Sequence, residues 1–124
     1  MPRGPEDKFK YDRVLKSLRA LGGWWCATPR TRFGISGIPD VIGVFDGLFV
    51  AIETKRPDGR GSYGTTATQS RTLSLISDAG GIGVVVNGQE SLNNLINTLA
   101  AYRQARNFKD AEGRAAQAEE ADVH

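Results

Sequence analysis

The chain has 124 residues, of which 40% are hydrophobic and 24% are charged, as expected for one globular domain. Its net charge of +2 is unevenly distributed, with 13 basic and 9 acidic residues in 1–104 and 3 basic and 5 acidic residues in 105–124. The single cysteine, Cys26, excludes an internal disulfide. Because the only histidine is the last residue, His124, the chain also lacks the ligands of a tetrahedral zinc site and the base of a serine–histidine or cysteine–histidine pair. A metal site would therefore have to use oxygen ligands, which favour Mg²⁺ or Mn²⁺. No apolar run approaches the ~18 residues of a membrane span and no signal-peptide pattern opens the chain, so we expect a cytoplasmic protein without a membrane partner.

The N-terminal part of the chain predicts a helix followed by a strand. Proline and acidic residues at 4–7 are typical of a helix start, and apolar residues then recur at helical spacing as far as Leu21. Residues 24–27 predict a short strand. Because Trp24 and Trp25 are adjacent in it, they face opposite sides of the sheet, and we expect at least one of them in the core.

The middle of the chain predicts a β-hairpin. Two apolar runs, 40–45 and 48–55, flank Asp46-Gly47, and Asp-Gly between such runs is a strong hairpin signal. If these two residues form the loop, Asp40 lies directly opposite Glu53, with their Cβ atoms roughly 4.5–5.5 Å apart. Two carboxylates about 5 Å apart repel by about 3 kcal/mol at an effective dielectric near 20. A divalent cation between them would convert the repulsion into binding, so the pattern predicts a metal site.

Strand alternation places Lys55 on the same face as Glu53, beside this predicted metal site. A metal ion with an adjacent lysine suggests hydrolysis of a phosphodiester. The alternative for the hairpin is structural. In that case Asp40 caps a turn, Glu53 lies on a solvated face and Lys55 is an ordinary strand-edge lysine.

The next segment predicts a helix and a buried strand. Thr66 and Gln69 match a capping box, which predicts a helix over 67–79. The continuous apolar run at 82–86 is typical of a strand buried on both faces. A strand, a helix and a second strand imply a right-handed crossover to a parallel neighbour.

Ser91 is expected to cap a last helix over 92–104. Residues 1–104 would then form one domain, and residues 105–124 a polar acidic tail that either extends this helix or is disordered. The whole order, αβββαβα, predicts an α/β fold with a mixed sheet flanked by helices.

Four patterns occur in the order and spacing of a known family: Gly37-Ile38-Pro39-Asp40, the strand 49–52 followed by Glu53-Thr54-Lys55, Gln69 at the start of the next helix, and Gly80-Gly81 before a valine strand. With them, the chain resembles the virus-type replication-repair nuclease (VRR-NUC) domain of the PD-(D/E)xK nuclease superfamily over residues 6–87. The resemblance implies a restriction-endonuclease-like core.

The resemblance also implies roles for the site residues. Asp40 and Glu53 would bind one or two metal ions, with the backbone carbonyl of Thr54 as a further ligand. Lys55 would position the attacking water or stabilise developing charge. Gln69 would reach toward Lys55 or the scissile phosphate, although a purely local role in the capping box is equally compatible with its position.

Other residues are candidates for the surroundings of the site. The resemblance implies that Glu6 reaches the metal; the alternative is a first-turn glutamate favoured by the helix dipole, and Asp7 is a rival. Residues in or beside the loops around the site are candidates for contacts with DNA phosphates and, for the tyrosine, for stacking on an unpaired base: Arg30, Arg32, Arg56, Arg60, Arg71 and Tyr63.

These observations predict a structure-selective DNA endonuclease that uses Mg²⁺ or Mn²⁺. As the resemblance implies for small stand-alone members, it would be a homodimer that resolves four-way (Holliday) junctions in DNA, since two strands need two sites and each chain offers one. Two alternatives remain open: a nuclease for flaps or single strands, and a non-catalytic nucleic-acid-binding module.

Overall fold

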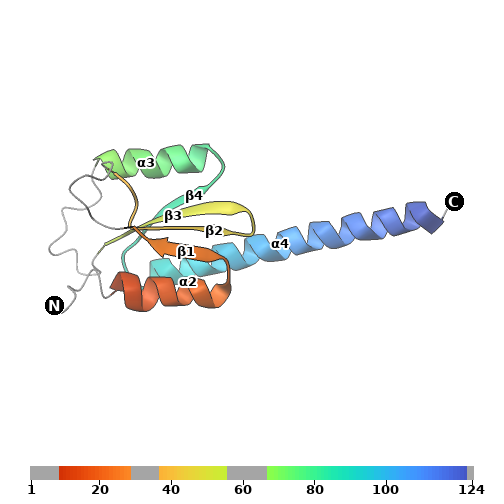
Figure 1. The fold of residues 1–124 in the computed structure, drawn as a ribbon, viewed down its shortest axis with the longest axis horizontal. Coiled ribbons are helices and arrows are strands. Elements are labelled where there is room, and N and C mark those ends of the chain that lie inside the picture. The colour runs from red at the N-terminus through yellow and green to blue at the C-terminus, as the bar shows by residue number, and fades with distance from the viewer. Residues whose placement is uncertain (1–8, 29–36, 56–66, 123–124) are drawn as a thin grey trace.

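A four-stranded mixed sheet forms the centre of the fold (Figure 1). The computed structural model describes residues 9–28, 37–55 and 67–122. The strands are β1 (Trp24–Ala27), β2 (Val41–Phe45), β3 (Leu48–Thr54) and β4 (Ile82–Val86). They lie side by side in chain order, with β1, β2 and β3 antiparallel and β4 parallel to β3.

Helices cover both faces of this sheet. A π-helical segment, Phe9–Leu15, continues into α2 (Lys16–Leu21), and the other helices are α3 (Ala67–Asp78) and α4 (Gln89–Asp122). Helix α3 lies over one face, and α2 and α4 lie over the other (Figure 1). The predicted α/β fold with a mixed sheet flanked by helices is therefore confirmed. Within the described ranges, no helix is long and apolar enough to cross a membrane.

The β2–β3 hairpin has the predicted loop and register. Asp46 (φ 50°) and Gly47 (φ 80°) are both in the left-handed region, as a two-residue turn matched to strand twist requires. The ladder runs from Phe45 opposite Leu48 to Val41 opposite Ile52.

The core lies between the sheet and the helices α2 and α4. Trp25 is only 4% exposed, whereas its neighbour Trp24 is 60% exposed on the opposite face, so the prediction that at least one tryptophan fills the core is confirmed. Three leucines of α4 at helical spacing pack in the same core: Leu92, Leu95 and Leu99.

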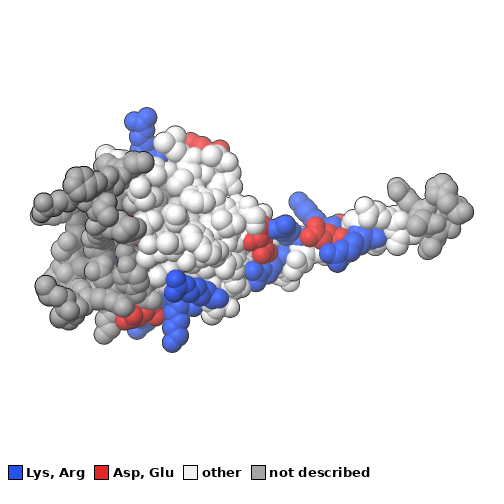
Figure 2. Space-filling view, viewed as in Figure 1, with Lys and Arg blue, Asp and Glu red and all other residues white. Residues whose placement is uncertain are grey.

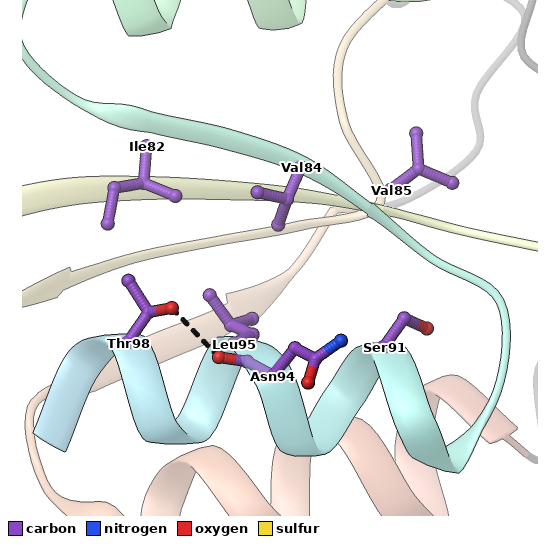
Figure 3. Close-up of a pocket in the computed structure, with 7 residues that line it drawn as sticks. All are labelled: Ile82, Val84, Val85, Ser91, Asn94, Leu95 and Thr98. Carbon is purple, nitrogen blue, oxygen red and sulfur yellow. Dashed lines mark hydrogen bonds between the residues drawn. The ribbon is translucent and has the colours of Figure 1, made fainter.

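Strand β4 is less buried than predicted. Its parallel pairing with β3 is confirmed, but only Val86 is buried, and Val85 is 37% exposed. The prediction of burial on both faces is wrong because β4 is an edge strand of the sheet. A pocket of about 270 Å³ lies between β4 and α4 (Figure 3), and none of its lining residues is a predicted site residue: Ile82, Val84, Val85, Ser91, Asn94, Leu95 and Thr98.

Helix α4 begins earlier than the predicted helix 92–104 and continues through residues 105–122, which is the helical one of the two alternatives for the tail. Ser91 lies inside its first turn, where the hydroxyl donates to the carbonyl of Gly88 and accepts from the amide of Asn87. Ser91 is therefore not the N-cap, and that prediction is wrong. The helix continues to Asp122, and its second half projects away from the sheet (Figure 1).

Arg103 fastens α4 to the turn of the hairpin. Its guanidinium donates to both carboxylate oxygens of Asp46 (3.1 Å each) and to the carbonyl of Leu21 (2.8 Å), and it lies 4.2 Å above the ring of Phe45. One turn later, Arg106 donates to the backbone carbonyl of Asp46. These contacts fix the direction in which the rest of α4 leaves the domain.

Candidate metal centre

Asp40 and Glu53 stand at the open end of the β2–β3 hairpin. The last ladder pair is Val41 with Ile52, so Asp40 and Glu53 occupy the next position on each side. Both side chains are buried, with exposures of 5% and 1%. Burial of an ionised carboxylate is expensive unless cations or hydrogen-bond donors surround it, so this end of the hairpin is built around two costly groups.

Asp40 is held by the end of β3. Its Oδ2 accepts hydrogen bonds from the amide and the hydroxyl of Thr54, both at 2.9 Å. The backbone beside it is tied to β1, because the amide of Thr28 donates to the Asp40 carbonyl (2.8 Å) and its hydroxyl donates to the Pro39 carbonyl (2.6 Å). Asp40 therefore has a structural role, joining three strands at this edge. Sequence reasoning missed these contacts of Asp40 with Thr54 and Thr28.

Lys55 links Glu53 to the first turn of α3. The Lys55 Nζ lies 3.9 Å from Glu53 Oε1, within ion-pair range but longer than a hydrogen bond, and 3.4 Å from Gln69 Oε1. The Lys55 amide donates to the carbonyl of Val86 (2.9 Å), which fixes the end of β3 against β4. Gln69 comes from the first turn of α3, so the crossover helix brings it to a strand end that lies fourteen residues earlier in the chain.

Charges in this cluster partly compensate each other. The Lys55 side chain is 13% exposed and Glu53 is 1% exposed. At 3.9 Å and an effective dielectric near 20, their attraction is about 4 kcal/mol before desolvation is counted. Lys55 thus offsets part of the cost of burying the Glu53 carboxylate.

The donor set fits a hard divalent cation. Mg²⁺ is usually held by one or two carboxylates and keeps several of its waters, and Mn²⁺ prefers the same oxygen ligands. Asp40 and Glu53 supply the carboxylates, and the Thr54 carbonyl is the third ligand that we expected. Among the described residues, no group of three or more histidine, cysteine, aspartate and glutamate side chains is placed to hold a metal ion.

Several predicted site residues lie outside the described residues: Glu6, Arg30, Arg32, Arg56, Arg60 and Tyr63. Thr66, the first residue of the predicted capping box, lies outside them as well. Arg71 is described and is exposed on α3, two residues after Gln69. The structure thus brings together Asp40, Glu53, Thr54, Lys55 and Gln69.

Comparison of the chain with family models, with curated proteins and with solved structures finds no match.

Proposed function

We propose that this protein is a metal-dependent, structure-selective DNA endonuclease with a restriction-endonuclease-like core of the PD-(D/E)xK type. The observation that carries the proposal is the buried cluster at the end of the hairpin. Two buried carboxylates flank the last ladder pair of the hairpin, a lysine lies 3.9 Å from one of them, and a glutamine from the next helix contacts that lysine. The order of these residues in the chain, and their resemblance to the VRR-NUC domain, add to this support.

Each side chain has a task in the proposed mechanism. Asp40, Glu53 and the Thr54 carbonyl would hold Mg²⁺ or Mn²⁺, which when bound supplies Lewis-acid activation of water and neutralises phosphate charge. Lys55, as a cation beside the site, would orient the attacking water or stabilise the charge that develops on the phosphate. Gln69 would hold the Lys55 ammonium through its side-chain oxygen. Thr54 would hold the Asp40 carboxylate in place through its two hydrogen bonds.

The proposed substrate is branched DNA, and the proposed active form is a homodimer. The described part of each chain carries one such cluster, so paired cuts in two strands would require two copies. The exposed Arg71 on α3 is the described candidate for a phosphate contact near the cluster. Flap and single-stranded nucleic acids are alternative substrates of the same chemistry.

A second candidate function is a non-catalytic nucleic-acid-binding module. The specific observation in its favour is that Thr54 gives Asp40 a structural role that needs no metal. In this reading the protein binds DNA equally well with and without a divalent ion, and no strand is cut.

A cleavage panel distinguishes these functions. Four-way junction, flap, single-stranded and linear duplex DNA would be incubated with Mg²⁺, Mn²⁺ or excess chelator. We expect cutting with either ion, fastest on the junction, and none in chelator. Asp40→Asn should abolish cutting, while Asp110→Asn, a charge-matched change far along α4, should not. Undiminished cutting in chelator would refute the mechanism, and binding without any cutting would support the second candidate.

A further inference from the structure

The pocket between β4 and α4 has apolar walls and no charged lining. Ile82 and Val84 line it from the strand and Leu95 from the helix (Figure 3). No residue is charged in 79–89 or in 91–102, the two stretches that contain every described lining residue. Apart from Glu90, the charged residues of α4 all lie at 103 or later, and both signs are visible along its projecting half in Figure 2. The charge complement of this pocket is therefore a neutral molecule.

Val85 presents its main chain to the outer edge of the sheet. In a parallel pair, alternate residues of a strand direct both their amide and their carbonyl toward the neighbouring strand. Val86 points toward β3, because its carbonyl accepts from the amide of Lys55 (2.9 Å). Val85 therefore directs its amide and carbonyl away from β3, to an edge that no other strand of the described sheet covers. Its side chain points away from α4 in Figure 3, so its main chain is the part that lines the pocket.

Serine side chains occupy this edge on both sides of Val85. The amide of Gly83 donates to the Ser77 hydroxyl (3.3 Å), and the amide of Asn87 donates to the Ser91 hydroxyl (3.0 Å). Among the described residues, Val85 is thus the one position of the edge whose outward amide has no hydrogen-bond partner. Strands usually have about five or six residues, so one amide between two occupied ones does not favour the addition of a peptide strand. It favours a compact ligand that bonds to a single residue.

The size of the pocket and the main chain of Val85 define the class of ligand. An apolar cavity of roughly 150 Å³ holds benzene, so a pocket of about 270 Å³ suits a flat molecule of two rings. The edge of this molecule needs an acceptor for the Val85 amide beside a donor for the Val85 carbonyl. Adenine combines two flat rings and no charge at neutral pH with such an edge, formed by a ring nitrogen and the exocyclic amino group. A phosphate group would find no cation in the lining of this pocket.

We propose that this pocket binds a neutral purine, as the free base or the nucleoside. Its rings lie between the strand side chains Ile82 and Val84 and the helix side chain Leu95, and its donor–acceptor edge bonds to the main chain of Val85. Apolar walls with a few polar groups that fix orientation are typical of sites for small molecules. The pocket shares no residue with the candidate metal centre, and binding is measured without DNA or metal, so the proposal does not rest on nuclease activity.

Titration of the full-length protein with adenosine, followed in amide NMR spectra, tests the site. We expect saturable shifts of the Val85 and Leu95 amides, with a Kd of about 1 mM or tighter. Adenosine dimethylated at its exocyclic amino group keeps both rings but loses the donor, so its Kd should be at least about threefold higher. Adenosine monophosphate should bind no tighter than adenosine, because the lining offers its phosphate no cation.

Two pairs of variants locate the ligand. Val85→Pro removes the outward amide without removing a ladder bond, which a free edge tolerates, whereas Val85→Thr keeps that amide. Thr98→Phe places a large side chain in the pocket, whereas Asn97→Phe places it one residue earlier on α4, outside the lining. We expect Val85→Pro and Thr98→Phe to raise the Kd of adenosine by at least about tenfold, read from the Leu95 amide, and both controls to bind as wild type does.

Several results would overturn the proposal. Wild type without saturable shifts has no purine site here, and equal Kd values for adenosine and its dimethylated form would mean that the Val85 carbonyl does not receive the ligand's donor. Adenosine monophosphate that binds tenfold tighter than adenosine would contradict a neutral ligand. Wild-type affinity in Thr98→Phe would place the ligand outside the pocket, and this test holds even if Val85→Pro does not fold.

Discussion

At the scale of single residues, the neighbours of Asp40 affect the stability of its ionised carboxylate in opposite directions. Its position opposite Glu53 is unfavourable by up to about 3 kcal/mol of like-charge repulsion. Its two hydrogen bonds from Thr54 are charge-assisted, and such bonds are worth about 1.5–3 kcal/mol each against 0.5–1.5 for neutral ones. The two bonds from Thr54 are therefore large enough to offset the like-charge repulsion, and the cost of burying the carboxylate comes in addition.

The residue types at the site could be predicted, but the contacts of Asp40 with β1 and β3 could not. Hairpin register follows from a two-residue loop, so the opposition of Asp40 and Glu53 follows from the sequence. The bonds from Thr54 depend on where the Asp40 side chain lies beyond the last ladder pair, and the Thr28 contacts depend on where β1 pairs. Neither leaves a periodic signal in the sequence.

Asp46 provides a residue-scale prediction about pH. The hydrogen bond from Arg103 lowers the pKa of the Asp46 carboxyl below its ordinary value of 3.8. A lowered folded-state pKa contributes stability that is complete above the unfolded pKa and is lost as the pH falls through the folded pKa. Asp46→Asn keeps a residue that tolerates positive φ in this turn but removes the charge.

We therefore expect wild type to have a higher Tm than Asp46→Asn at about pH 6, and the gap to close as the pH falls below about 4, where the carboxyl becomes protonated. Thermal melts across pH measure the gap. A gap that stays constant down to pH values near 2 would show that the charge of Asp46 is not what Arg103 stabilises.

At the scale of elements, strong local signals predicted the structure well. The Asp-Gly turn, the adjacent tryptophans and the apolar run at 82–86 each led to the observed strand, with bounds within a residue or two. The predictions that failed depend on which other elements pack against a given strand or helix. An apolar strand buried on both faces has the same pattern as an apolar edge strand, so the exposure of β4 could not be predicted. For residues 105–124 the sequence left two alternatives, an extension of the last helix or disorder, because the second half of α4 has no core to impose a strong apolar pattern.

Gly43 provides the element-scale prediction. A Cβ at this position of β2 would overlap the Trp25 ring and the Trp24 carbonyl, so two strands pack through a site with no room for a side chain. We expect Gly43→Ala to lower the free energy of unfolding by about 1–3 kcal/mol through overpacking. The control is Gly113→Ala, where no described atom lies within 4 Å of the new Cβ and helix propensity improves by about 0.8–1 kcal/mol. Urea titration should show a lower free energy of unfolding for Gly43→Ala and a higher one for Gly113→Ala. An unchanged free energy of unfolding in Gly43→Ala would mean that β1 and β2 can move apart without loss of stability.

At the scale of the whole molecule, the candidate site and the second half of α4 belong to opposite ends of the hairpin. The site lies at the open end of the hairpin, whereas α4 is fastened to the hairpin's turn by Arg103 and Arg106 and leaves the domain there.

The central claim is that Asp40 and Glu53 form a metal site, and thermal melts with and without Mn²⁺ test it most directly. Wild type should gain about 2.7 kcal/mol when the metal concentration is about 100 times Kd. Asp40→Asn should lie within about 1 kcal/mol of wild type without metal, because relief of repulsion offsets weaker bonds from Thr54, and it should lose most of the gain. Asp110→Asn should keep the gain. An equal gain in wild type and Asp40→Asn, or no gain in wild type, would contradict the claim.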